Sequence, residues 1–389
     1  MSERATTSPA RRGSRRTAVW PGVAFDPRRN SLNLLRLVFA LLVIVAHSYY
    51  TGGFGHGPTP AGNNLGGWAV IGFFVVSGYL ITGSRLGNSF GSYLARRAAR
   101  IYPGFWVNLI VTALVVAPLA WVFGPRGPAV APAGGPDPAS RSLADFLTSP
   151  TRPWAYVLGN ATLWMRRYDV AGGPLGVPYP GVWNGSLWTL VVEFACYLMI
   201  GIGFAILWFR RHPRVAVVLA YAIALAVTVA SRQVLGGIGG ATGVSVVKLV
   251  PCFLAGALLY VFRDKLRFHL PGALACLAAS VAIIWPLGDL GIAFAAPFLG
   301  YVIFWVSMVA PSPRVVLTED ISYGVYIYGF LAEQILAQFG IERYGLAPYI
   351  VLSMLATIPL AIASWLLVEK PVMTWTRARL RGRPKAATG

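Results

Sequence analysis

Residues 33–50 read NLLRLVFALLVIVAHSYY, a mostly apolar run that contains one arginine, Arg36, and one histidine, His47. A helix needs roughly 17–25 predominantly apolar residues to cross a bilayer. This run is long enough, so it predicts a membrane-spanning helix. No small-x-small cleavage site follows it, and we therefore do not interpret it as a cleaved signal peptide.

The same criterion finds ten such runs along the 389 residues of the chain. They cover residues 33–50, 67–84, 103–123, 187–208, 214–231, 244–262, 270–286, 289–310, 321–339 and 346–368. The seventh and eighth are separated only by residues 286–289, so one long kinked segment is an alternative there. Hydrophobic residues make up 56% of the chain and charged residues 12%, against about 25% charged in a soluble domain. The sequence predicts an all-α, polytopic membrane protein with about ten transmembrane helices, and it excludes a soluble enzyme or a disordered chain.

The charge is unbalanced, with 33 Lys and Arg residues against 13 Asp and Glu residues. A nucleic-acid-binding protein would not carry this much apolar sequence. Most of the basic residues fall in the two ends of the chain and in the short connections after the second, fourth and sixth runs. Basic residues gather in cytoplasmic loops, so both termini are predicted to be cytoplasmic. We expect basic tails at 1–30 and 373–389 around a transmembrane domain at 31–372.

The connection at about 124–186 is predicted to be a long extracytoplasmic loop, rich in glycine and proline. Within it, residues 154–164 form a semi-apolar stretch of about 11 residues, which is too short to span a bilayer. We expect an interfacial or re-entrant helix there. If this stretch did span, the topology of everything after it would be inverted.

Ionisable residues inside the apolar runs are the main indication of function, because a charge at the bilayer centre costs about 2.5–3.5 kcal/mol on insertion scales. Arg36 and His47 are eleven residues apart, which turns a helix about 20° past three full turns, so both lie on one face about 16 Å apart. Glu193 lies near the outer end of the fourth run and is predicted to meet His47. A histidine held by a carboxylate is the usual arrangement of a general base. Tyr197 lies one turn beyond Glu193 and shares its face.

Arginines at the start of the third run are candidates for binding phosphate. Arg97 and Arg100 are three residues apart and face the same way, with Arg96 beside them, and guanidinium groups bind phosphate oxygens bidentately. The alternative is ordinary cytoplasmic charge for these residues and an interfacial position for Arg36.

Other polar residues within the runs carry weaker predictions. Lys248 is expected to reach the membrane interface. Glu333 either pairs with Lys248 or lines a cavity. The three cysteines, Cys196, Cys252 and Cys276, are expected to be small core residues. No metal-binding or nucleotide-binding motif occurs, so we predict no metal.

Six sequence motifs occur in order along the chain. They are Arg36 with His47 ten residues between, GFFVVSGYLI at 72–81, RAARIYP at 97–103, SLWTLVVE at 186–193, ISYGVY at 321–326 and VEKP at 368–371. Together they resemble the acyltransferase-3 family of integral membrane O-acyltransferases over residues 30–372. One departure is Gly329, since the family often has a histidine near that position. The SGNH-type domain that some members add is not expected in this chain.

The resemblance implies ten helices and transfer of an acyl group, most often acetyl, from cytoplasmic acyl-CoA to a hydroxyl of a sugar or glycan of the cell envelope. Acetyl-CoA would be a co-substrate, and no tightly bound cofactor is expected. Arg36, Arg97 and Arg100 would hold the CoA phosphates, and His47 with Glu193 would be catalytic. The motif residues expected to bind substrate are Tyr79, Trp188, Tyr197, Tyr323 and Tyr326.

Two alternatives stay open on the sequence alone. The acceptor is either an envelope glycan or a small secondary metabolite such as a macrolide sugar. A transporter or flippase of lipid-linked sugars shares the topology, but it favours paired half-repeats, which we do not find. We expect a multi-pass protein of the cell membrane; the acceptor, the acyl chain length and the oligomeric state do not follow from the sequence.

Overall fold

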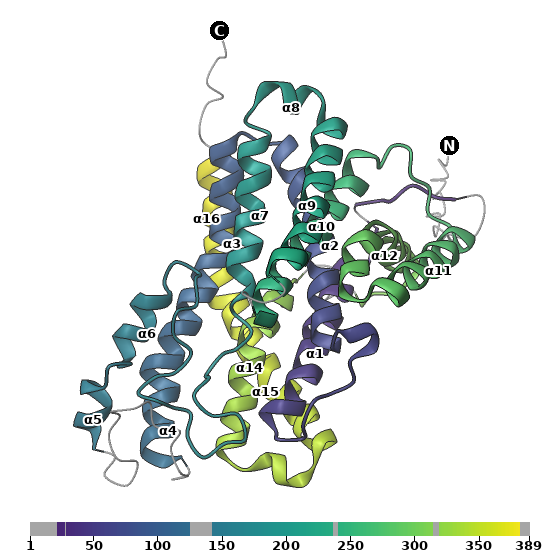
Figure 1. Cartoon of the computed structure of the whole chain (residues 1–389). Coiled ribbons are helices and arrows are strands. Elements are labelled where there is room, and N and C mark those ends of the chain that lie inside the picture. Colours follow the sequence, from purple (N-terminus) through teal and green to yellow (C-terminus); the bar gives the residue numbers. More distant parts are fainter. Residues whose placement is uncertain (1–21, 28, 125–141, 236–239, 314–318, 382–389) are drawn as a thin grey trace, which may run out of the picture.

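The computed structural model describes residues 22–27, 29–124, 142–235, 240–313 and 319–381, and within these ranges the chain forms helices and no strand (Figure 1). The α-helices are α1 (Leu32–Thr51), α2 (Leu65–Leu86), α3 (Phe90–Val111), α4 (Ala117–Phe123), α5 (Leu143–Thr148), α6 (Pro153–Asn160), α7 (Thr189–Gly203), α8 (Leu207–Arg211), α9 (Pro213–Leu235), α10 (Gly240–Val261), α11 (Leu270–Leu287), α12 (Asp289–Val309), α14 (Ser322–Gln338), α15 (Leu346–Ser364) and α16 (Lys370–Arg381). Short 3-10 segments are η1 (Pro60–Gly62) and η3 (Ile341–Tyr344), and π segments are η2 (Thr112–Val116) and η4 (Trp365–Glu369).

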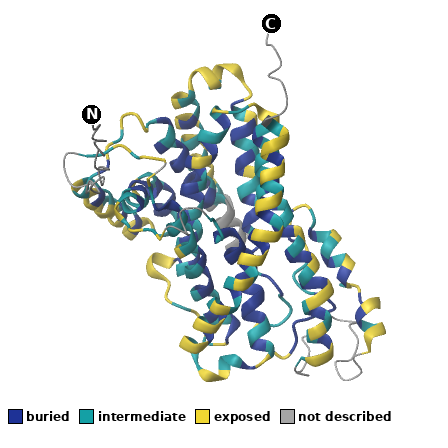
Figure 2. Cartoon of the chain, turned by 180° about the vertical axis from the view of Figure 1, so that it is seen from behind, coloured by how far each residue is buried: buried dark blue, intermediate teal, exposed yellow. Residues whose placement is uncertain are grey.

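Each of the ten predicted runs coincides with a helix or a pair of consecutive helices. Seven continuous helices in the described residues are long and apolar enough to cross a membrane, and α7 and residues 247–261 of α10 are shorter apolar helices. Exposed residues follow the outer faces of the bundle (Figure 2), and large apolar side chains such as Phe123, Ile223 and Leu355 are among them. Such an apolar exterior is typical of a surface in contact with lipid. The protein is therefore a helical multi-pass membrane protein, as predicted.

Two predicted boundaries were wrong, and in both cases the helix is longer than the apolar run. The third begins at Phe90 because the side chain of Ser89 accepts a hydrogen bond from the amide of Ser92, and it continues without a break to Phe123. The last helix runs from Leu346 through η4 to at least residue 380, so the predicted tail at 373–389 begins as helix. Polar helical turns thus stand where a short connection was expected before the third run and a tail was expected after the last.

The two open questions about spans are also answered. Helices α11 and α12 pack against each other, and Gly288 makes the turn between them with φ of 55°, so residues 270–309 form two helices and not one kinked segment. The stretch 154–164 contains α6, which is eight residues long. It does not span, and it lies against α3, where the indole of Trp106 donates to the carbonyl of Ala161 at 2.9 Å.

Helix α14 lies at the centre of the bundle, with almost all of its residues buried, between α1 and α15. Helix α2 packs between α1 and α10. At the α2–α10 crossing, a Cβ on Gly78 would lie 1.8 Å from the carbonyl oxygen of Phe253, and one on Gly256 would lie 1.9 Å from that of Val75. Only glycine fits such a backbone approach, which explains the two glycines.

The two ends of the bundle differ in what they carry. Helices α8 and α16 lie toward one end, and α4, α5 and α6 lie toward the other (Figure 1). This agrees with the order of loops predicted from the basic residues, although which end faces the cytoplasm stays a prediction. The tails at 1–21 and 382–389 lie outside the described residues.

Candidate active site

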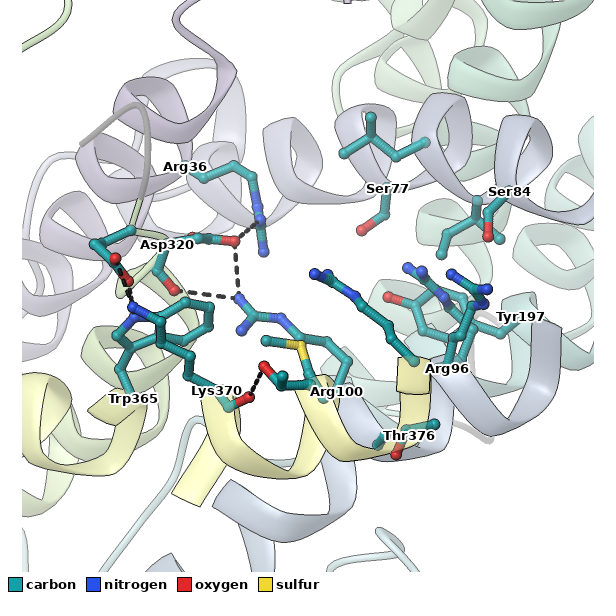
Figure 3. A pocket seen from close by; sticks show the side chains of 18 residues that line it. Arg36, Ser77, Ser84, Arg96, Arg100, Tyr197, Asp320, Trp365, Lys370 and Thr376 are labelled. Atoms are coloured by element: carbon teal, nitrogen blue, oxygen red, sulfur yellow. Dashed lines mark hydrogen bonds and ion pairs between the residues drawn. The ribbon is translucent and has the colours of Figure 1, made fainter. Parts of the chain in front are cut away.

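A cavity of about 430 Å³ lies among α1, α2, α3, α7 and α16. Its polar wall is formed by Arg36 of α1, Ser77 and Ser84 of α2, Arg96, Arg97 and Arg100 of α3, Tyr197 of α7, Glu319 and Asp320 before α14, and Lys370, Thr374, Thr376 and Arg377 of α16 (Figure 3). Six of these side chains are cationic and two are anionic. The three arginines predicted to bind phosphate therefore do line one cavity.

Asp320 ties two of those arginines together. Arg36 forms an ion pair with its carboxylate, and Arg100 donates to the same oxygen at 2.8 Å. Arg100 also pairs with the fully buried carboxylate of Glu369 at 2.9 Å, and its guanidinium lies 5.3 Å from the ring centre of Trp365. Arg36 and Arg100 are thus neutralised within the protein, which the sequence did not predict.

The charge state of Asp320 follows from these contacts. Burial by itself would raise the pKa of Asp320, but the guanidinium groups of Arg36 and Arg100, with hydrogen bonds from Ser322, hold the pKa down at about 2. The carboxylate is therefore ionised throughout the physiological range. Through its two arginine partners it joins α1, α3 and the start of α14 beside the cavity.

Arg96 and Arg97 are different, because no carboxylate pairs with either of them in the described part of the chain. The Nε atoms of both are buried and have no hydrogen-bond partner among the described residues. A buried donor left without an acceptor costs about 1–3 kcal/mol, and more when it is charged. These two guanidinium groups therefore present unmet donors in an open cavity.

The predicted meeting of Glu193 with His47 was wrong. Glu193 accepts hydrogen bonds from Ser77 at 2.7 Å and from Tyr197 at 2.6 Å, and both of these residues line the cavity. Its carboxylate therefore fixes the deep wall of the arginine cavity. The expected sharing of a face by Glu193 and Tyr197 is confirmed.

The carboxylate beside His47 is that of Glu333 on α14. The Oε2 atom of Glu333 lies 3.7 Å from Nδ1 of His47, and neither atom has a hydrogen-bond partner among the described residues. The other oxygen of Glu333 accepts from the hydroxyl of Ser48 at 2.8 Å. Lys248, which we had considered as a partner for Glu333, pairs instead with Asp289 at 2.9 Å.

Aromatic rings surround His47 on the side away from the arginine cavity. The ring centres of Phe330 and Tyr50 are 5.1 Å and 5.5 Å from that of His47. Tyr179 of the long loop packs on Tyr50 at 4.9 Å and is 38% exposed. The amide of Gln334 holds this loop by donating to the carbonyls of residues 179 and 182 at 2.7 and 2.8 Å. The loop thus packs beside His47.

Of the five residues predicted to bind substrate, Tyr197 lines the cavity and the others do not. Tyr79 is buried in an aromatic cluster with Phe304. Tyr323 and Tyr326 are buried, and their hydroxyls donate to the carbonyls of residues 101 and 186. Trp188 packs at the edge of the hydrophobic core. These motif residues hold helices together, because each of their polar atoms already has a partner inside the protein or the ring lies in the core.

Cys196, Cys252 and Cys276 are free thiols, and the first two are buried. No cluster of side chains suited to a metal occurs among the described residues.

Comparison with known proteins identifies the family. The family model described as an acyltransferase domain matches residues 29–366. The chain is similar to the O-acetyl transferase of Shigella phage Sf6, with 26% identity over 364 residues, which is 91% of this chain and 98% of that protein. It is also similar to nodulation protein 10 of Rhizobium leguminosarum bv. viciae, with 26% identity over 369 residues, which is 89% of this chain and 93% of that protein. No solved structure matches it significantly.

The family match covers most of the chain, and the fold is the multi-pass helical bundle predicted from the sequence. The chain therefore belongs to the acyltransferase-3 family and is a membrane O-acyltransferase.

Proposed function

We propose that the protein transfers an acetyl group from acetyl-CoA to a hydroxyl of a carbohydrate, either a glycan of the cell envelope or the sugar of a small metabolite. It would act in the cell membrane with the arginine cavity open to the cytoplasm. The observation that carries this proposal is the pair of unmet guanidinium donors, Arg96 and Arg97, in a cavity of about 430 Å³.

The cavity suits the phosphates of CoA better than a neutral ligand. CoA carries a diphosphate and a 3′-phosphate, and a guanidinium group binds two phosphate oxygens at once. Arg377 and Lys370 of α16 also line the cavity, although Lys370 already pairs with Glu319 at 2.7 Å. Arg96, Arg97 and Arg377 are therefore the phosphate ligands in this proposal, while Arg36 and Arg100 shape the mouth through Asp320.

The reacting end of the donor would lie toward His47. Arg36 and His47 share one helix, and eleven residues at about 1.5 Å each separate them by about 16 Å. The cavity reaches into the bundle as far as Ser77 and Tyr197. In this proposal the pantetheine arm of CoA continues from there between the helices.

His47 would act as the general base. Its imidazole takes the proton of the acceptor hydroxyl as the oxygen attacks the thioester carbonyl. When the tetrahedral intermediate collapses, the C–S bond breaks and the proton passes to the sulfur, which leaves an ester and free CoA. Proton transfer by a positioned histidine contributes roughly 10²–10⁴-fold to such a reaction.

The acceptor side rests on the aromatic surface near His47. Tyr179 and Tyr50 lie next to it, and aromatic rings together with hydroxyl groups suit the apolar faces and polar edges of a sugar. The name of the phage relative, an O-acetyl transferase, supports acetyl as the group and oxygen as the acceptor atom.

The test is consumption of acetyl-CoA by the purified protein in detergent or nanodiscs, with lysed-envelope glycans as acceptor and free thiol as the readout. The proposal predicts release of CoA that depends on the acceptor and is roughly 10²–10⁴-fold slower in His47→Ala protein. Mass spectrometry of glycans from cells with and without the protein would name the acceptor. A protein that moves a lipid-linked sugar but releases no CoA would be a flippase, and the proposal would fail.

A further inference from the structure

Glu333 is a fully buried carboxylate in the middle of α14 for which the proposed reaction has so far given no role. Its side chain is 0% exposed, whereas that of His47 is 14% exposed. Burying an ionised carboxylate is costly unless a partner compensates it. Among the described residues, His47 is the basic side chain that forms an ion pair with Glu333.

The surroundings hold Glu333 in one place. Its backbone carbonyl accepts from the hydroxyl of Tyr349 at 2.7 Å, and its Oε1 accepts from Ser48 at 2.8 Å. One turn earlier, a Cβ on Gly329 would lie 2.8 Å from Cγ1 of Ile44, so the missing side chain lets α14 approach α1. This approach brings Glu333 to the face of α1 that carries His47.

The free oxygen of Glu333 faces the buried nitrogen of His47. The Oε2–Nδ1 separation of 3.7 Å is longer than a hydrogen bond, and both atoms are buried without other described partners. Catalytic hydrogen bonds are often long without substrate and shorten in the complex. A carboxylate on Nδ1 keeps the proton there, leaves Nε2 as the base and stabilises the imidazolium that forms.

We infer that Glu333 is a positioning residue that acts through His47. The inference rests on the proposed acyl transfer. During the attack, Nε2 takes the hydroxyl proton while Nδ1–H donates to Oε2 of Glu333. When Nε2 returns its proton to the departing sulfur, the imidazole is neutral again and the carboxylate has not changed its protonation.

The experiment is a double-mutant cycle in purified full-length protein, with Glu333→Gln, His47→Ala and both changes together. Glutamine keeps the volume and one acceptor oxygen, so the bundle is retained, but it removes the charge. We expect Glu333→Gln to lower kcat by at least about 10-fold, because losing the charge of a carboxylate that orients a catalytic histidine can cost up to about 10⁴-fold, with the KM for acetyl-CoA unchanged. In the His47→Ala protein the second change should lower kcat no further, because residues that act as a unit are not additive.

The matched control is Ser353→Ala, which removes another buried hydroxyl without a described partner from α15, the helix next to α14. Its kcat and KM should equal those of the wild type. Equal losses from Glu333→Gln with and without His47, or wild-type kcat in a folded Glu333→Gln protein, would overturn the inference. If wild-type protein released no CoA from acetyl-CoA, the proposed function itself would fail, which is a separate result.

Discussion

The arginine cavity and the surroundings of His47 differ in how they treat charge. At the cavity, carboxylates of the protein neutralise Arg36 and Arg100, whereas Arg96 and Arg97 line the cavity without a carboxylate partner among the described residues. Around His47, one buried carboxylate faces one buried imidazole nitrogen among aromatic rings. The first arrangement suits binding of a multiply charged ligand, and the second suits transfer of a proton. In the proposed function the first region therefore binds the donor and the second carries out the chemistry.

The largest expected effect breaks the chemical region. His47→Ala should lower kcat by roughly 10²–10⁴-fold because the general base is lost. The bundle should be retained, since alanine is accepted in a helix. Acetyl-CoA turnover is the measurement, with the thermal midpoint as control. Wild-type turnover by a correctly inserted variant would contradict the assignment.

A second change removes the link at the mouth of the cavity. Asp320→Asn leaves Arg36 without its carboxylate and Arg100 with Glu369 alone, so we expect a loss of about 3 kcal/mol in stability, the lower end for a broken buried pair. Thermal unfolding in detergent measures it. An unchanged midpoint would show that Asp320 does not hold the helices together.

The pH dependence of that link has a definite sign. The pKa of Asp320 is about 2 in the folded protein against 3.8 ordinarily. Its contribution to stability is therefore fully present above about pH 4 and is lost as the pH falls toward about 2. Acid unfolding of wild type against Asp320→Asn should differ above pH 4 and converge below it. A constant difference across the whole range would contradict this.

Breaking the binding region should affect KM more than kcat. Replacing both Arg96 and Arg97 with alanine removes charge-assisted hydrogen bonds worth roughly 1.5–3 kcal/mol, so the KM for acetyl-CoA should rise about 10–100-fold. Arg152→Ala is the matched control, because Arg152 is an exposed arginine stacked on Trp154 at the other end of the bundle. If the KM for acetyl-CoA were the same in the double variant and in Arg152→Ala, Arg96 and Arg97 would have no role in binding the donor.

The smallest effect concerns the acceptor. Tyr179→Ala removes one ring from the surface near His47, and a lost aromatic contact of about 0.5–1.5 kcal/mol raises the acceptor KM by roughly 2–10-fold. The KM for acetyl-CoA should not change. A change in the KM for acetyl-CoA with an unchanged acceptor KM would contradict a role of Tyr179 in binding the acceptor.

Much of the fold and part of the candidate site could be predicted from the sequence. Hydropathy alone predicted ten apolar runs, and each coincides with helix in the described residues, because a bilayer demands long apolar runs. Arg97 and Arg100 both line the cavity, as their spacing predicts, while the shared face of Arg36 and His47 stays a prediction. Contacts between side chains could not be predicted where the two residues are far apart in the sequence. Asp320 is 284 residues from Arg36, and Glu333 is 285 residues from Ser48.

The errors have physical causes as well. Glu193 was paired with His47 by depth in the membrane, but depth does not fix which face of a helix a side chain occupies, and Glu193 faces Ser77 and Tyr197 instead. The apolar run ends near residue 368, so the sequence places Arg377 in a tail. The helix in fact continues beyond that point, and Arg377 lines the cavity. Glu369 stood in a quoted motif, but no pattern in the sequence linked it to Arg100.

The central claim is that donor binding and catalysis lie in two different regions. It is tested most directly by equilibrium binding of labelled acetyl-CoA to purified wild type, His47→Ala and the Arg96→Ala/Arg97→Ala double variant. The account predicts that His47→Ala protein binds the donor as tightly as the wild type while transferring acetyl roughly 10²–10⁴-fold more slowly. It predicts that the arginine variant binds the donor at least about 10-fold more weakly. Equal loss of binding in both variants, or wild-type binding by the arginine variant, would contradict it.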